Sequence, residues 1–168
     1  IKRGTGEESD SGVIEEIVYE GFGPGGAALL IQCLTDNRNR SIADVRTVMN
    51  KHGGNLGEKG SVMWMFELKG LIVAKAEITD ELELVLIDVG AEDIRNEDGM
   101  LEIVTGSSDL KKVLDVIQSL GLSVEHTGLE YLSKDSLAVA GEDKEKLEKL
   151  IDLLDELDDV DSVFTNQQ

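Results

Sequence analysis

The chain has 168 residues, 40% of them apolar and 30% charged, with a single Pro. This length suits one large domain or two small ones, and the composition excludes Pro-rich disorder, while no apolar run approaches the roughly 18 residues needed to span a bilayer. With 35 acidic against 16 basic side chains the net charge is −19, which excludes a uniformly basic nucleic-acid binder, because affinity for the phosphate backbone comes largely from Lys and Arg.

The first third of the chain begins with a polar, Gly-containing segment. Residues 1–12 cannot pack alone, and we expect them to follow a further segment of a longer protein. Residues 13–20 mix β-branched and charged side chains, which predicts a strand. Four Gly and one Pro over residues 21–26 predict a turn. The apolar run 27–35 fits a buried strand, although its length does not exclude a helix.

A helix is predicted over residues 41–52. Ser41 is suited to cap its first turn, with Asp44 three residues on, and Gly53 is suited to end it. At about 100° per residue, the apolar positions and His52 fall on one face, whereas Arg46 and Lys51 fall on the other. We therefore expect one side of this helix to face a core and the other to be polar and mildly basic.

The middle of the chain predicts strands, a helix and a hairpin. After a Gly-rich loop at 53–60, residues 62–66 and 71–74 are typical of two strands separated at Gly70. Thr79 and Gly90 bracket a helical apolar pattern, but its Leu-Val-Leu-Ile run equally fits a strand. Asp98-Gly99, between 93–97 and 100–105, is the signal of a β-hairpin.

The last third predicts two helices, each followed by a short strand. Apolar residues recur at helical spacing over 110–120 and 147–157, and β-like segments follow at 122–126 and 160–165. The predicted fold class is α+β, with two small α/β sandwich domains whose sheets are mainly antiparallel. Because the centre of the chain forms a complete domain, we expect the C-terminal helix and strand to return to the first sheet, so that the second domain is inserted into the first.

The charge is distributed unevenly along the chain. Residues 1–70 carry −2 and residues 71–168 carry −17, while residues 36–59 have a local charge of +2. A polyanion-facing surface is therefore expected only in this basic segment. The candidate nucleic-acid contacts are Arg38, Arg40, Arg46, Lys51 and Lys59. A solvated polar face is the alternative interpretation of the same residues.

No catalytic or metal-binding pattern is legible in the sequence, so we expect neither an enzyme nor a cofactor. His52 and His126 lack ligand spacing with Cys33, and a structural zinc site needs about four such ligands. We expect His52 to be packed and hydrogen-bonded, and Cys33 to be a buried, inert thiol in a reducing compartment. The loop 21–26 fits neither phosphate-binding fingerprint, and Asp155–Asp161 lacks the ligand pattern of a calcium loop.

Several motifs together resemble the YebC family. They are Tyr19-Glu-Gly-Phe-Gly-Pro-Gly-Gly, Cys33-Leu-Thr-Asp-Asn-Arg-Asn-Arg, Lys51-His-Gly-Gly-Asn-Leu-Gly and Gly60-Ser-Val. The family's loop residues correspond here to Gly21, Gly23, Pro24, Gly25, Gly26, Gly53, Gly54, Asn55 and Gly57. The opening Ile-Lys-Arg-Gly-Thr-Gly-Glu resembles the family's junction into its second domain.

The resemblance implies both an organisation and a function. It places domain two at 1–76 plus 137–168 and domain three at 77–136, after a basic N-terminal helical domain that this sequence does not contain. Family members are described as probable transcriptional regulators, mitochondrial relatives act as translational activators, and members have been linked to the ribosome. We therefore expect a nucleic-acid-associated regulator of gene expression, in the cytoplasm or, for a eukaryotic source, in mitochondria.

The expected partners follow from this interpretation. They are DNA, or RNA and the ribosome, with help from the basic N-terminal domain, and no membrane. The alternative is an acidic adaptor that docks a basic protein and makes no direct contact with nucleic acid.

Overall fold

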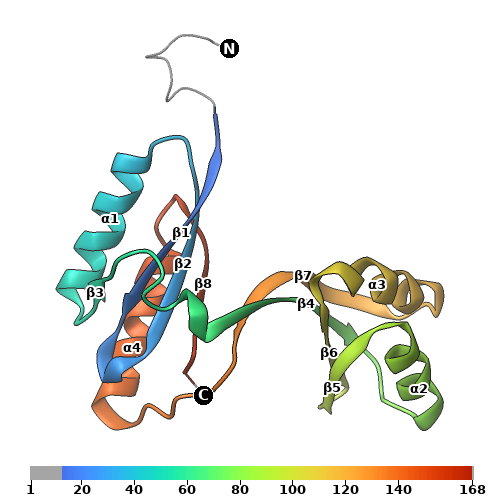
Figure 1. Ribbon diagram of the computed structural model, residues 1–168. Coiled ribbons are helices and arrows are strands. Elements are labelled where there is room, and N and C mark those ends of the chain that lie inside the picture. The colour runs from blue at the N-terminus through green and yellow to red at the C-terminus, as the bar shows by residue number, and fades with distance from the viewer. Residues whose placement is uncertain (1–12, 168) are drawn as a thin grey trace. The chain divides into compact units, whose positions relative to one another are not determined.

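The computed structural model describes residues 13–167, so the expectation for residues 1–12 lies outside the described part (Figure 1). The chain divides into two compact units. The first unit takes in the chain up to Glu67 and again from Ser133, and the second unit is Leu68–Leu132. The domain boundaries after residues 76 and 136 stay predictions.

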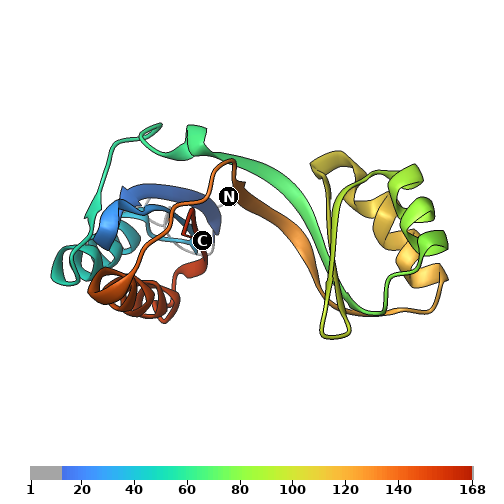
Figure 2. The ribbon, with the colours of Figure 1, turned by 90° about the horizontal axis from the view of Figure 1, so that it is seen from below.

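The first unit is a four-stranded sheet with two helices on one face. Its strand order is β3-β1-β2-β8. These strands are β1 (Glu15–Phe22), β2 (Ala28–Thr35), β3 (Asn55–Leu56) and β8 (Val160–Thr165). Both α1 (Arg38–Lys51) and α4 (Gly141–Asp155) pack against the face that carries Leu29, Ile31 and Cys33 (Figure 2). Because β2 runs antiparallel to β8, the C-terminal helix and strand return to the first sheet, as predicted.

The second unit repeats this layering with a sheet of order β5-β6-β4-β7. Its strands are β4 (Phe66–Lys75), β5 (Ala91–Glu97), β6 (Met100–Gly106) and β7 (Ser123–Ser133). The helices α2 (Asp80–Val89) and α3 (Leu110–Ser119) share a core with one face of the sheet, which includes Ile72 and Ile103. The predicted α+β class, with mainly antiparallel sheets, is confirmed by both units.

Local capping signals determine the second unit's helix and hairpin. The Thr79 hydroxyl accepts the backbone N–H of Leu82 at 3.1 Å, and Gly90 ends α2 with a φ of 126°. This excludes the strand interpretation of the Leu-Val-Leu-Ile run. Asp98 and Gly99 both have positive φ, which matches the right-handed twist of the strands that they join. The predicted hairpin is confirmed.

Several predicted elements are wrong in their extent. The helix predicted over 147–157 begins at Gly141, and the strand predicted over 122–126 runs on to Ser133. The helix predicted over 41–52 begins three residues earlier, because the side chain of Asn37, rather than Ser41, caps it. Residues 62–66 and 71–74 are not two strands: residues 63–65 form a short 3₁₀ turn, η3 (Met63–Met65), and β4 runs uninterrupted through Gly70. A Cβ at Gly70 would meet Thr105 Oγ1 and would lie 2.8 Å from Leu110 Cβ, so this glycine permits close packing rather than a break.

Candidate nucleic-acid interface

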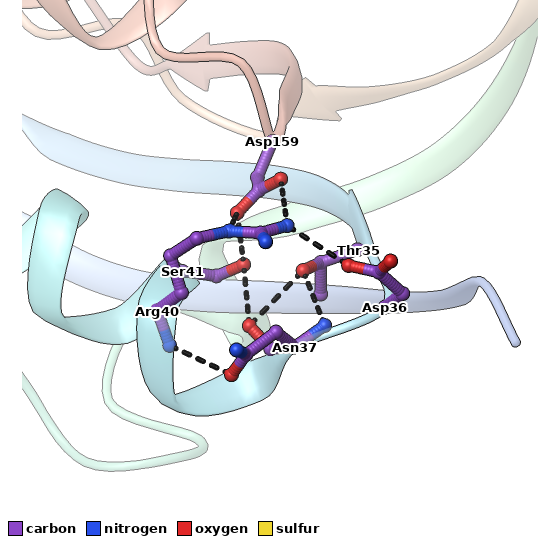
Figure 3. Close-up of polar contacts among 6 residues, drawn as sticks. All are labelled: Thr35, Asp36, Asn37, Arg40, Ser41 and Asp159. Atoms are coloured by element: carbon purple, nitrogen blue, oxygen red, sulfur yellow. Dashed lines mark hydrogen bonds and ion pairs between the residues drawn. The ribbon is translucent and has the colours of Figure 1, made fainter. Parts of the chain in front are cut away.

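The turn between β2 and α1 is built by its own polar side chains (Figure 3). Thr35 Oγ1 accepts the backbone N–H of Asn37 at 2.9 Å, and Asn37 Oδ1 accepts the backbone N–H of Arg40 at 3.1 Å. The second bond satisfies one of the free N–H groups at the start of the helix. The motif Thr35-Asp-Asn therefore fixes where α1 begins.

Asp159, far away in sequence, completes this network. Arg40 donates from Nε to Asp159 Oδ2 at 3.1 Å and from Nη2 to Asp159 Oδ1 at 2.9 Å, and Nη2 also contacts Asp36 at 2.9 Å. The buried Ser41 hydroxyl lies 2.8 Å from Asp159 Oδ2. The ion pair joins the start of α1 to the turn before β8, as Figure 3 shows.

The network also sets the charge state of its members. Hydrogen bonds from Arg40 and Ser41 hold the pKa of Asp159 below its usual value, although partial burial acts in the opposite direction. The same bonds to Asp159 and Asp36 raise the pKa of Arg40. Arg40 is thus a paired bridging residue, and a phosphate would have to compete with two carboxylates for it.

Removing the Asp159 carboxylate tests this bridge. We expect Asp159→Ala to lower the free energy of unfolding by about 2 kcal/mol, because hydrogen bonds to a charged group are lost together with a partner for the buried Ser41 hydroxyl. The measurement is urea unfolding followed by circular dichroism. The matched control is Asp158→Ala, at an exposed neighbouring position, and equal losses in both variants would contradict the bridging role.

The other predicted basic residues lie in different surroundings. Arg38 Nε contacts Glu15 Oε1 at 3.1 Å, and Arg38 and Lys59 line a hollow of about 460 Å³ together with Glu16 and Glu20. Arg40 lines a second hollow, of about 420 Å³, whose walls include Asp44, Glu156, Asp158 and Asp159. These two hollows combine cations with carboxylates.

Arg46 and Lys51 are the two predicted basic residues that remain exposed on α1 with no partner among the described residues. The structure thus brings Arg38 and Lys59 together, places Arg40 in an ion-pair network, and leaves Arg46 and Lys51 on the helix surface. Nucleic-acid contact by these five residues stays a prediction.

The glycine-rich motifs occupy closely packed places in the first unit. Residues 21–26 end β1 and form the short turn η2 (Pro24–Gly26), and residues 53–57 contain β3. A Cβ at Gly21 would lie 2.6 Å from the backbone oxygen of Asn55, and one at Gly54 would lie 2.9 Å from the backbone oxygen of Phe22. These two glycines allow β3 to approach β1, so their spacing has a structural explanation.

Glu20 is a structurally important residue whose role the sequence analysis missed. Its side chain is buried, and its carboxylate accepts the backbone N–H groups of Gly60 at 2.7 Å, Val62 at 2.9 Å and Met63 at 2.7 Å. Burial by itself would raise the pKa of Glu20, but these hydrogen bonds lower it below its usual value. The available signal was a carboxylate at the end of a predicted strand, 40 residues before Gly60, the last residue of the Gly-rich loop.

A third hollow gathers basic residues that the sequence analysis did not connect. It has a volume of about 320 Å³ and is lined by Lys51, His52, Gly53, Lys146 and Lys149. Lys146 and Lys149 were missed because α4 is acidic in composition. The signal was their three-residue spacing, which places both on one helix face.

The two residues considered for nucleophilic or metal chemistry have simpler places. Cys33 is fully buried, and desolvation raises the pKa of its thiol to about 11, which confirms the prediction of an inert thiol. The prediction of a packed, hydrogen-bonded His52 is wrong: His52 ends α1, is partly exposed, and has no side-chain hydrogen bond among the described residues. The reason is that His52 is the C-cap residue, just beyond the last residue of the helix whose apolar side packs in the core.

Two features are absent from residues 13–167. No group of three or more His, Cys, Asp and Glu side chains is arranged to hold a metal ion. No helix in this range is both long and apolar enough to cross a membrane.

Comparisons with known proteins point to one family. The family described as "TACO1/YebC second and third domain" matches residues 14–167. A "Probable transcriptional regulatory protein" of Deinococcus radiodurans is 45% identical over 99% of this chain and 68% of its own length. A protein of the same name from Syntrophus aciditrophicus is 41% identical over 99% of this chain and 67% of its own length.

A solved structure supports the same grouping. The crystal structure of a conserved hypothetical protein from Aquifex aeolicus is 39% identical, with a TM-score of 0.83, over 92% of this chain and 65% of that chain. The present chain therefore spans about two thirds of the length of these similar proteins. The names that the two curated relatives carry are regulatory rather than enzymatic.

Proposed function

Since the chain belongs to the TACO1/YebC family, as its second and third domain, we propose that it is a regulator of gene expression that contacts nucleic acid through the first unit. Regulation is the role that its relatives' names carry. The proposed target is DNA, or RNA at the ribosome, in the cytoplasm.

The observation that carries the nucleic-acid contact is the exposed basic surface of α1. Arg46 and Lys51 have no partner among the described residues, in a chain of net charge −19. Few cations make few phosphate contacts, and such contacts fix position rather than sequence. We therefore expect weak, salt-sensitive binding without sequence preference, strengthened in the full-length protein by the basic N-terminal domain that the resemblance implies.

Crosslinking of the full-length protein in cells tests this proposal. The bound material is sorted into DNA, ribosomal RNA, messenger RNA and protein, and we expect nucleic acid to be recovered. Recovery of protein alone, unchanged by nuclease treatment, would contradict the proposal.

A charge reversal on α1 sharpens the test. Arg46→Glu is expected to reduce the recovered nucleic acid several-fold, because one phosphate contact is lost and a repulsion is added. The salt slope, which is the slope of the logarithm of the binding constant against the logarithm of the salt concentration, should fall in magnitude by about 1. The matched control is Arg95→Glu, an exposed arginine on β5 in the second unit. Equal reductions in both variants would reflect net charge rather than a contact on α1.

A second candidate function is an adaptor that binds a basic protein. The observation in its favour is α2, where Leu84, Val85 and Ile87 are exposed to 69%, 43% and 53%. Acidic residues surround them on the same helix, namely Asp80, Glu81, Glu83 and Asp88. Leu84→Ser together with Ile87→Ser would release a protein partner bound at this face while leaving nucleic-acid recovery unchanged.

A further inference from the structure

The third hollow of the first unit brings together cations from two helices. Lys51 and His52 come from the end of α1, Gly53 follows them, and Lys146 and Lys149 come from the middle of α4. The apolar sides of both helices pack into one core, through Met49 on α1 and Leu147 and Leu150 on α4. The three lysines are therefore held near one another by the fold rather than by contacts among themselves.

The hollow differs from the other two in its charge. Its lining contains three lysines and no carboxylate, whereas each of the other two hollows has at least two carboxylates in its wall. Lys51 and Lys149 have no ion pair among the described residues, and Lys146 has only a 3.8 Å contact with Glu142. The protein has an excess of acidic residues that could pair with its cations, yet these three lysines line one hollow together.

Local helix stabilisation explains only part of this arrangement. A lysine in the last turn interacts favourably with the C-terminal end of a helix, which accounts for Lys51. A Glu four residues before a Lys is a favourable helix pair, which accounts for Lys146. Lys149 follows Glu145 at the same spacing, but no ion pair joins the two among the described residues. Neither effect accounts for the convergence of all three lysines on one carboxylate-free hollow, because like charges brought together repel one another.

We infer that this hollow seats a phosphate group of a nucleic-acid backbone, an inference that rests on the proposed function and gives it a site. Its three ammonium groups, on flexible stems, suit a phosphate as point charges and do not require a fixed orientation. Gly53 adds no side chain to the lining of the hollow. The proposed site therefore binds the phosphate backbone of the nucleic acid and makes no contact with the bases.

The test is a salt series of binding to the full-length protein. The probes are a short labelled single-stranded RNA and a short DNA duplex, and the variant is the triple substitution Lys51→Gln, Lys146→Gln and Lys149→Gln. We expect about a tenfold or greater loss of affinity at low salt, and a salt slope reduced in magnitude by about 2. All three lysines are exposed, so we expect only a small shift in the thermal unfolding midpoint.

The matched control removes the same charge from the second unit. Lys75→Gln, Lys111→Gln and Lys112→Gln also replace three exposed lysines, and this variant should bind close to the wild type. If the wild type binds and the two triple variants bind alike, the hollow is not the site, although the proposed function stands. If the wild type binds neither probe, the proposed function fails together with the site.

One outcome would assign the hollow to another partner. If the first triple variant keeps its nucleic-acid affinity but loses a co-purifying acidic protein, the inference is overturned in favour of a protein contact. A loss of affinity confined to the first variant, with the salt slope reduced, supports the phosphate site.

Discussion

Glu20→Ala is expected to lower the free energy of unfolding by about 3 kcal/mol or more. The carboxylate accepts three backbone N–H groups, from Gly60, Val62 and Met63. Without it these donors lose their acceptor in a region where Val62 is fully buried, and each unsatisfied buried donor costs about 1–3 kcal/mol. The measurement is urea unfolding of the purified chain, with hydrogen exchange of the β1 and β2 amides as a second readout.

Two substitutions separate hydrogen bonding from charge and size. Glu20→Gln keeps one side-chain oxygen as an acceptor, so it should cost less than Glu20→Ala. Glu16→Ala, on the same strand but exposed, removes only a surface hydrogen bond with Gln32 and should cost less than about 1 kcal/mol. A loss for Glu20→Ala no larger than that for Glu16→Ala would contradict the proposed role of Glu20 in holding the loop.

The pH dependence of stability follows from the same carboxylate. Because the pKa of Glu20 is lowered in the folded state from an ordinary value of 4.5, the folded protein favours the ionised form more than the unfolded chain does. This contribution is fully present above about pH 4.5 and is lost as the pH falls through the lower folded-state value. The stability difference between wild type and Glu20→Gln should therefore narrow below pH 4.5, and a constant difference down to low pH would contradict this origin.

Gly70→Ala is expected to destabilise the second unit by about 3 kcal/mol. A Cβ at this position would meet Thr105 Oγ1 and would lie 2.8 Å from Leu110 Cβ. Thr105 is fully buried and its hydroxyl donates to the Gly106 oxygen at 2.8 Å, so it cannot move aside without losing that bond. Overpacking of this kind typically costs 1–3 kcal/mol.

Hydrogen exchange locates the effect of this substitution. Amides of β4 and β6 should lose protection, whereas those of β1 and β2 should keep it. The matched control is Gly128→Ala on β7 of the same unit, where a Cβ would meet nothing within 4 Å. Equal losses for the two glycines would contradict the explanation from close packing at Gly70.

Local sequence signals were reliable where the structure is local. The cap at Thr79, the end of α2 at Gly90 and the hairpin turn at Asp98-Gly99 involve neighbours within four residues, and all three were predicted. The start of α1 was missed because Asn37 and Ser41, four positions apart, both suit a cap. Asn37 caps the helix, and the hydroxyl of Ser41 binds Asp159 instead. The role of Gly70 was misread because Thr105 and Leu110, which pack against it, lie more than 30 positions away in the sequence.

At the candidate interface, too, the sequence predicted local features of the basic segment at residues 36–59 but not its long-range contacts. The sequence indicates which cations lie close together along the chain, but not which of them find a carboxylate. Arg40 is paired by Asp159, which is 119 residues away. Lys51 gains Lys146 and Lys149 as neighbours, from a helix of acidic composition.

The amino-acid sequence by itself determined the α+β class, the inert Cys33 and the family, because periodicity, turn chemistry and motif spacing act over short stretches. Only the tertiary structure decided the burial of Glu20, the pairing of Arg40 and the assembly of the lysine hollow. These depend on backbone donors and charges from distant segments, and their positions are fixed only once the helices pack on their sheet.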